Sequence, residues 1–194
     1  YFHFINLSSQ GKSNHGFPIE EYFSFNNEVE LSEITMVNSE DKKYASMIYI
    51  HESSPENYKS IKYLNFKDGS PLPKSGNFIY PFPANEFELL DFHIKDENTQ
   101  YILSGHYLKS QPIRNWPNKV NYYKSITIGE IRNQEFNHVK IEDEGKFYSE
   151  IGLYNNGKQI LISGLYAPFM DGKIEGVFTA EVDNEGKVIN KKYT

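Results

Sequence analysis

A repeated pattern limits the possible folds of this chain more than any other feature. The stretch YILSGHY at 101–107 recurs as ILISGLY at 160–166, and a looser copy without the glycine, YASMIYI, occupies 44–50. The glycines of the two closest copies, Gly105 and Gly164, stand 59 positions apart. Self-similarity at such a spacing indicates a repeat architecture, in which one small unit is stacked several times. The fold is therefore expected to consist of one unit that recurs about every 50–65 residues.

Each repeat is predicted to be a run of short strands joined by polar turns. Aromatic residues make up 15% of the chain, and Tyr and Phe favour strands because a flat ring packs well on a pleated surface. A first strand is expected in three units, at 31–37, 87–94 and 149–154. A third strand that ends in a polar turn is expected in four places, beginning at 4, 63, 126 and 178. No window has sustained helical periodicity, so each unit is predicted to be a four-stranded antiparallel meander.

Repeated meanders of this kind are typical of the blades of a β-propeller. We expect an all-β propeller with about three blades and a partial one, forming a single β-repeat domain. The partial blade covers 1–30, and the blades cover about 31–86, 87–146 and 147–194. Because four third strands accompany only three first strands, an open fan would leave strand edges unpaired. These blades are thus expected to belong to a larger ring, and a β-trefoil or a sandwich remains the alternative.

The composition excludes several classes of function. The formal net charge is −6 and no cluster of Lys or Arg offsets it, which argues against nucleic acid as a partner. The chain has no cysteine, so disulfides, zinc–thiolate sites and thiol nucleophiles are excluded. No apolar stretch approaches the roughly 18 residues that a membrane-spanning helix needs, so no transmembrane segment is expected. The first residues have neither a basic region nor a small-residue cleavage site, so no signal peptide is expected in this chain.

The candidate binding residues lie in the loops between the second and third strands of the last two units. The loop 109–121 holds the single Trp of the chain beside an Arg, and these two residue types are enriched at interface hot spots. The shorter loop 167–172 again places an aromatic residue at its tip, and a Tyr precedes each loop. Corresponding loops of neighbouring blades gather on one face, which predicts a surface for a protein partner. Its expected members are Arg114, Trp116, Phe169, Tyr107 and Tyr166. The alternative is that each ring folds back onto its own blade.

No catalytic residue, cofactor or metal site is predicted. The six histidines lack the spacing of a metal-ligating motif. Ser104 and Ser163 precede glycines, but neither stands in a Gly-x-Ser-x-Gly motif, and their recurrence at a repeat position favours a structural role. The acidic run 142–144 would serve acid–base chemistry only if its carboxylates converged with others in a cleft, which a sequence does not show.

One motif resembles a known group of proteins. The pattern Ser-Gly-x-Tyr at 163–166, followed after a variable loop by Gly-Val-Phe-x-x-x-Val-Asp at 176–183, is similar to repeats of large, uncharacterised propeller proteins of Bacteroidota cell envelopes. The resemblance covers most of the chain and is clearest from Phe87 onward. It implies an extracytoplasmic location, in the periplasm or at the cell surface, and a non-catalytic role.

Three functions remain open at this point. The first is a non-catalytic binding or scaffold propeller that holds a protein partner, as an accessory subunit of an outer-membrane secretion or uptake assembly. The alternative is a glycan-binding propeller or a carbohydrate-active propeller enzyme, and the third possibility is a purely structural repeat segment. Carboxylates that converge on the propeller axis would favour the enzyme, whereas an axis lined by Tyr, Ser and apolar groups would favour the scaffold.

Overall fold

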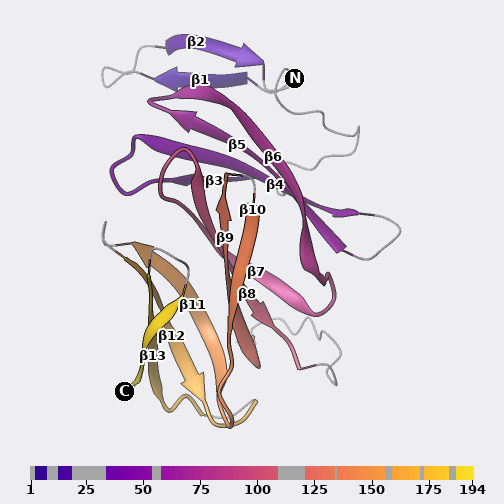
Figure 1. Ribbon diagram of the computed structural model, residues 1–194, viewed down its shortest axis with the longest axis vertical. Helices are drawn as coiled ribbons and strands as arrows, with labels where there is room; N and C mark the ends of the chain where they lie inside the picture. Colours follow the sequence, from indigo (N-terminus) through magenta and orange to yellow (C-terminus); the bar gives the residue numbers. More distant parts are fainter. Residues whose placement is uncertain are drawn as a thin grey trace. The chain divides into compact units, whose positions relative to one another are not determined.

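Every regular element of the described chain is a β-strand, so the prediction of an all-β protein is confirmed (Figure 1). The computed structural model describes residues 3–7, 13–18, 34–53, 58–108, 121–133, 135–155, 159–170, 173–183 and 187–194. Within these residues no helix has the length and apolar character needed to cross a lipid bilayer. The chain divides into two compact units, 1–80 and 81–194.

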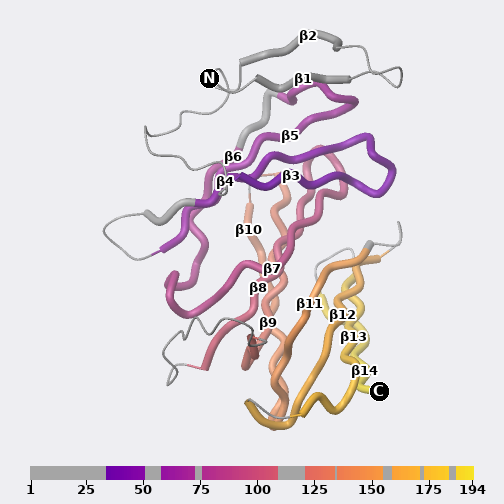
Figure 2. The backbone as a smooth tube through the Cα atoms, turned by 180° about the vertical axis from the view of Figure 1, so that it is seen from behind, coloured from indigo at the N-terminus to yellow at the C-terminus, as the bar shows by residue number. Residues whose placement is uncertain are grey.

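The first unit contains a two-stranded hairpin (Figure 1) and a four-stranded sheet (Figure 2). The hairpin consists of β1 (His3–Leu7) and β2 (Ser13–Pro18). The sheet follows chain order with β3 (Ile34–Asn38), β4 (Tyr44–Ser53), β5 (Tyr58–Lys67) and β6 (Ser70–Pro83), whose last residues belong to the second unit. The β5–β6 turn has Asp68 at φ 48° and Gly69 at φ 77°. Two consecutive positive φ angles match the Asp-Gly hairpin turn that the sequence indicates here.

The second unit contains two more four-stranded sheets, each an antiparallel meander in chain order. The first, the β7–β10 sheet, consists of β7 (Phe87–Ile94), β8 (Thr99–His106), β9 (Ser125–Arg132) and β10 (Glu135–Ile141). The second, the β11–β14 sheet, consists of β11 (Phe147–Asn155), β12 (Ile160–Ala167), β13 (Gly176–Val182) and β14 (Val188–Tyr193).

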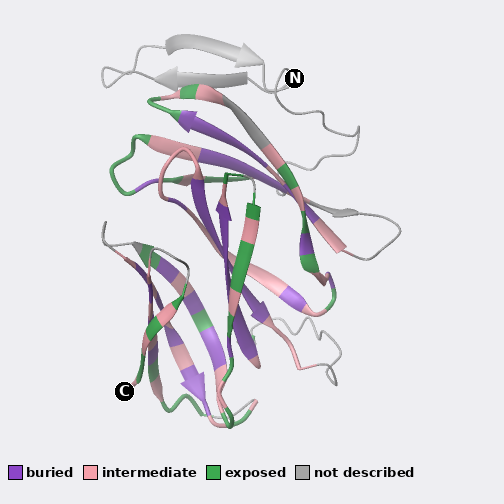
Figure 3. Cartoon of the chain, viewed as in Figure 1, coloured by how far each residue is buried: buried purple, intermediate pink, exposed green. Residues whose placement is uncertain are grey.

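The two sheets of the second unit share one hydrophobic core. Strands β8 and β9 are buried along most of their length (Figure 3). Their residues in the shared core alternate along the strand, and Leu103 and Ile128 are almost completely buried. On β12 and β13 the alternation brings Ile162 and Phe178 into the same core. Strand alternation therefore supplies each sheet with one apolar face, and the two faces pack against each other.

The repeated glycines lie on equivalent strands, because Gly105 is on β8 and Gly164 is on β12, the second strand of each sheet. The first strand beside each glycine carries a β-bulge, between Leu89 and Asp91 on β7 and between Ser149 and Gly152 on β11. A bulge adds one unpaired residue to a strand and bends it toward its neighbour. Gly164 lies against the bulge of β11, where a side chain has little room, whereas the space beside Gly105 is filled by the ring of Tyr123.

Candidate functional site

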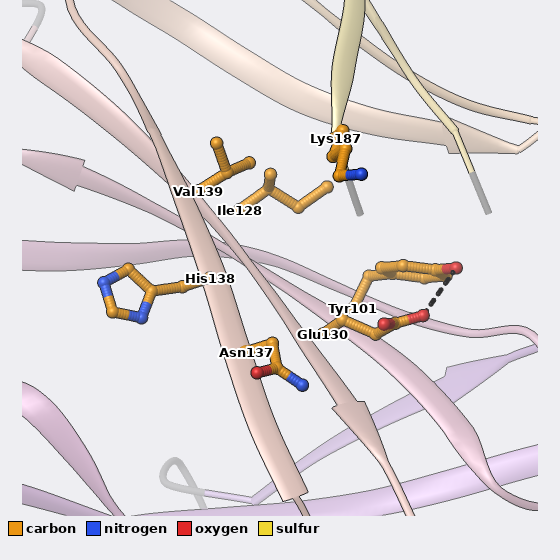
Figure 4. Close-up of a pocket in the computed structure, with 7 residues that line it drawn as sticks. All are labelled: Tyr101, Ile128, Glu130, Asn137, His138, Val139 and Lys187. Carbon is orange, nitrogen blue, oxygen red and sulfur yellow. Dashed lines mark hydrogen bonds between the residues drawn. The ribbon is translucent and has the colours of Figure 1, made fainter. Parts of the chain in front are cut away.

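A pocket of about 200 Å³ opens beside the shared core of the second unit (Figure 4). Its lining residues are Tyr101, Ile128, Glu130, Asn137, His138, Val139 and Lys187. All but one come from the β7–β10 sheet, and Lys187 directly precedes β14 of the other sheet. The pocket therefore lies where the two packed sheets separate at one end.

Strand pairing places three polar side chains of the pocket in one row. Tyr101 is paired with Glu130 across β8 and β9, and Glu130 is paired with Asn137 across β9 and β10. Directly paired residues of an antiparallel sheet project from the same face. Ile128 and Val139, which are also paired, lie two positions along the same strands and on the same face. The pocket thus has a polar row beside an apolar wall.

His138 is adjacent to this row in sequence but points to the other face of the sheet. Its ring is turned away from Glu130 and Tyr101 (Figure 4) and lies 5.7 Å from the ring of Phe136. His138 therefore contributes little more than backbone to the pocket.

Glu130 is the most constrained polar group of the site. The residue is only 6% exposed, although a buried carboxylate is costly unless hydrogen bonds compensate it. Arg132 donates from its guanidinium to Oε1 at 2.6 Å, and the hydroxyl of Tyr101 donates to the same oxygen at 3.3 Å. Among the described residues, both donors to Glu130 thus reach the same oxygen, Oε1, and Oε2 is left on the side of the pocket (Figure 4).

The environment of Glu130 also fixes the protonation of Tyr101. Burial, together with the adjacent carboxylate of Glu130, raises the pKa of Tyr101 to about 12. The phenol therefore stays protonated at neutral pH and acts as a hydrogen-bond donor.

The lining of the pocket is suited to binding a small molecule. Only Glu130 among its lining residues carries a carboxylate, whereas glycoside hydrolysis uses two carboxylates that flank the bond. Across the described part of the chain, no three or more His, Cys, Asp or Glu side chains gather as they would around a metal ion. The pocket offers hydrogen-bond donors and acceptors around an apolar wall, which orients a small molecule.

Of the three described residues that the sequence indicates for partner binding, Phe169 is the most accessible. It is 71% exposed in the loop between β12 and β13. Ile174 and Val177 of the same hairpin are also exposed, at 40% and 42%. Arg114 and Trp116 lie outside the described residues.

The two tyrosines of that set are held within the fold. The hydroxyl of Tyr107 donates to Glu88 Oε2 at 2.6 Å, and the hydroxyl of Tyr123 donates to the same oxygen at 2.8 Å. Burial and the hydrogen bond to Glu88 raise the pKa of Tyr107 above its usual range. Tyr166 is 9% exposed and belongs to the core, with the Lys146 ammonium 4.3 Å from its ring centre. The structure therefore does not bring Tyr166 to the surface beside Phe169.

The acidic run 142–144 contains a residue that joins distant strands. Asp143 Oδ2 accepts a hydrogen bond from the hydroxyl of Tyr148 at 3.0 Å and another from the hydroxyl of Tyr193, while Lys191 donates to Oδ1. Partial burial by itself raises the pKa of Asp143, but these three hydrogen bonds outweigh it and hold the pKa below its usual range. This carboxylate is a structural group of the unit.

His106 also occupies a structural position. Its ring lies 4.5 Å from the ring of Phe82, and its Nε2 is 3.2 Å from the Ser104 hydroxyl. Burial, with smaller contributions from Lys140 and His138, lowers the pKa of His106 to about 4. The imidazole is therefore neutral at pH 7.

Comparison with known proteins does not assign the site. No model of a known family matches this chain, and no curated protein matches it.

Sequence reasoning missed the pocket, although one signal for part of it was present. In the strand 125–132, apolar residues occupy 126 and 128, so the alternation places position 130 on the same inward face. A Glu at an inward position of an apolar strand indicates a functional or hydrogen-bonded group. Asn137 and Lys187 had no comparable signal, because their positions depend on register and on sheet packing.

Proposed function

We propose that this chain is a non-catalytic binding or scaffold protein, built of consecutive propeller blades, that holds a protein partner. The observation that carries the proposal is the hairpin between β12 and β13. It exposes three large apolar side chains within nine residues, Phe169, Ile174 and Val177, on a sheet whose core is otherwise well packed. Loops on a rigid scaffold commonly carry binding, and exposed aromatic residues serve as anchors there.

The contacts between the two sheets of the second unit support the propeller interpretation. Neighbouring blades of a propeller pack face to face with their first strands adjacent. In this unit the first strands β7 and β11 are linked, because the backbone N–H of Leu153 donates to Asp91 Oδ2 at 2.8 Å. The shared hydrophobic core lies between the two sheets.

A larger ring is supported by the burial of equivalent strands. Strand β8 is buried at all but its last position, whereas its counterpart β12 alternates between buried and half-buried residues. The outer face of the β11–β14 sheet therefore retains apolar groups, including Tyr154 and Ile189, that another blade would cover. Electron microscopy of the intact protein tests this, with a closed ring expected and an isolated open stack contradicting it.

The alternative of a carbohydrate-active enzyme has less support. The pocket lining contains a single carboxylate, and that carboxylate already accepts hydrogen bonds from Arg132 and Tyr101. The cell-envelope location and the accessory role in a secretion or uptake assembly rest on the sequence resemblance alone. They are part of the proposal on that basis.

The Phe169→Ala variant tests the proposed binding surface. A photoreactive residue at position 169 first identifies the partner by cross-linking in cells, and the purified partner is then titrated against each variant. We expect Phe169→Ala to weaken binding by more than about 1 kcal/mol, roughly fivefold or more, as truncation of a hot-spot residue does. The free energy of unfolding should change by less than about 0.5 kcal/mol, because the side chain is exposed.

Two further variants make this test specific. Ile79→Ala is the matched control, because Ile79 is also a large exposed apolar residue but lies on β6. It should leave affinity unchanged. Trp116→Ala is expected to weaken binding with little change in stability, as the composition of its loop predicts. If Phe169→Ala binds the partner as tightly as the original chain, the hairpin is not the binding surface.

A further inference from the structure

We propose that the pocket at Glu130 is a binding site for a neutral polyhydroxyl ligand, the size of one sugar ring. This inference goes beyond the proposed protein-binding role, because the pocket and the β12–β13 hairpin use different residues. The two sites can therefore be tested separately.

The first argument is the incomplete hydrogen bonding of Glu130. The residue is more than nine-tenths buried, and its hydrogen bonds from Tyr101 and Arg132 both end on Oε1. Oε2 of the same carboxylate faces the pocket, on the side of Asn137 (Figure 4). Oε2 is not among the fully buried side-chain atoms that lack a hydrogen-bond partner, so it is open to the pocket, where a ligand hydroxyl can donate to it in place of water.

The second argument concerns the charges around the pocket. A cationic ligand would be repelled by the Arg132 guanidinium, which contacts the carboxylate of Glu130 at 2.6 Å, and by the ammonium of Lys187, which also lines the pocket. An anionic ligand would meet the free oxygen of Glu130. A neutral ligand avoids both repulsions, and hydroxyl groups both donate to a carboxylate and accept from an ammonium or an amide.

The third argument concerns shape and surface. The volume of about 200 Å³ is below the roughly 300–1,000 Å³ typical of pockets for drug-sized ligands, which indicates a small occupant. Ile128 and Val139 form an apolar wall beside the polar row of Tyr101, Glu130 and Asn137. A sugar ring has the matching character, since its C–H groups contact an apolar wall while its hydroxyls reach the polar row.

Ligand-observed NMR with the intact protein tests the proposal. The probes are glucose, galactose, mannose and N-acetylglucosamine, with glycine, lysine and inorganic phosphate as charged comparisons. We expect at least one sugar to bind saturably with a Kd of about millimolar order, which is typical of weak small-ligand binding. The charged probes are expected not to compete for the pocket.

The variants locate the binding in the pocket. Glu130→Gln removes the charged acceptor and should weaken sugar binding by more than about tenfold, whereas Asn137→Ala should weaken it about three- to tenfold. Glu135→Gln is the matched control, because it makes the same charge change at an exposed position on the strand of Asn137. It should leave binding unchanged. If the Glu130→Gln variant does not fold, the Asn137→Ala variant still tests the proposal, because Asn137 is exposed.

Three results would overturn the inference. The first is that none of the four sugars binds. The second is that a sugar binds equally well to the original chain and to the Asn137→Ala and Glu130→Gln variants. The third is that glycine or lysine binds in place of the sugars with dependence on Glu130, which would assign the pocket to amino compounds. Loss of protein-partner binding in the Phe169→Ala variant with sugar binding intact would separate this site from the proposed partner surface.

Discussion

Replacing Gly164 with Ala is expected to lower the free energy of unfolding by at least about 2 kcal/mol. A Cβ atom at this position would lie 2.1 Å from Ile151 Cδ1, 2.9 Å from the carbonyl oxygen of Ser149 and 3.0 Å from that of Glu150. The Ile151 side chain can move, but the two carbonyls belong to the backbone of the bulge. Glu150 already adopts φ 49°, an uncommon angle for a residue with a side chain. The bulge therefore has little freedom to accommodate the methyl group.

Urea unfolding of the variant measures this effect, and Gly152→Ala is its matched control. A Cβ atom at Gly152 would meet its nearest atom at 3.5 Å, which is ordinary contact. Gly152→Ala should change the unfolding free energy by less than about 1 kcal/mol. Equal losses of unfolding free energy in the two variants would show that replacing either glycine destabilises the sheet to the same extent. The close approach of the bulge to Gly164 would then not be the cause.

Replacing Asp143 with Asn is expected to cost about 2 kcal/mol at pH 7, because it removes the charge that accepts from Lys191, Tyr193 and Tyr148. Tyr148 is fully buried, and its hydroxyl also lies 2.9 Å from that of Tyr193. The substitution therefore weakens several hydrogen bonds of one small network at the same time. Glu142→Gln is the matched control, since Glu142 is an exposed neighbour whose ion pair with Lys140 is of the surface type. It should cost less than about 0.5 kcal/mol.

The contribution of Asp143 is expected to depend on pH with a definite sign. Its pKa is depressed in the folded chain, so its stabilising effect is fully present above the unfolded pKa of about 3.9. The effect is lost as the pH falls through the lower folded pKa, because protonation then costs the folded state more than the unfolded state. Urea unfolding at pH 7, 5 and 3 should show the gap between the original chain and Asp143→Asn shrinking only below about pH 4. A gap that is constant over this range would assign the loss to packing.

The strands themselves could be predicted from the sequence because their signals are local. Alternation at 126–131 and 178–182 places apolar residues on one face, and these segments lie in β9 and β13. The turn between β5 and β6 needs positive φ angles that few residues accept, and Asp68 and Gly69 accept them. This turn could therefore also be predicted from the local sequence. The recurrence of Ser-Gly at 104–105 and 163–164 correctly placed both glycines on second strands.

The bulges could not be predicted, because an extra residue in a strand is decided by the surface it packs against. Nothing in the residues 89–91 or 149–152 alone separates a bulged strand from a regular one. The structure shows that the bulge lies on the strand beside the glycine, and that Gly164 leaves the space for it.

The sites depended most on tertiary structure. Alternation alone places Glu130 inward, but its hydrogen bond with Tyr101 requires the register of β8 and β9. Lys187 reaches the pocket only because a second sheet packs on the first, and Asp143 meets Tyr193 across 50 positions of sequence. Periodicity and turn chemistry act over a few residues, so the sequence by itself determined strands and turns. Which side chains meet across strands and sheets depends on how whole apolar faces pack, and that was decided only by the tertiary structure.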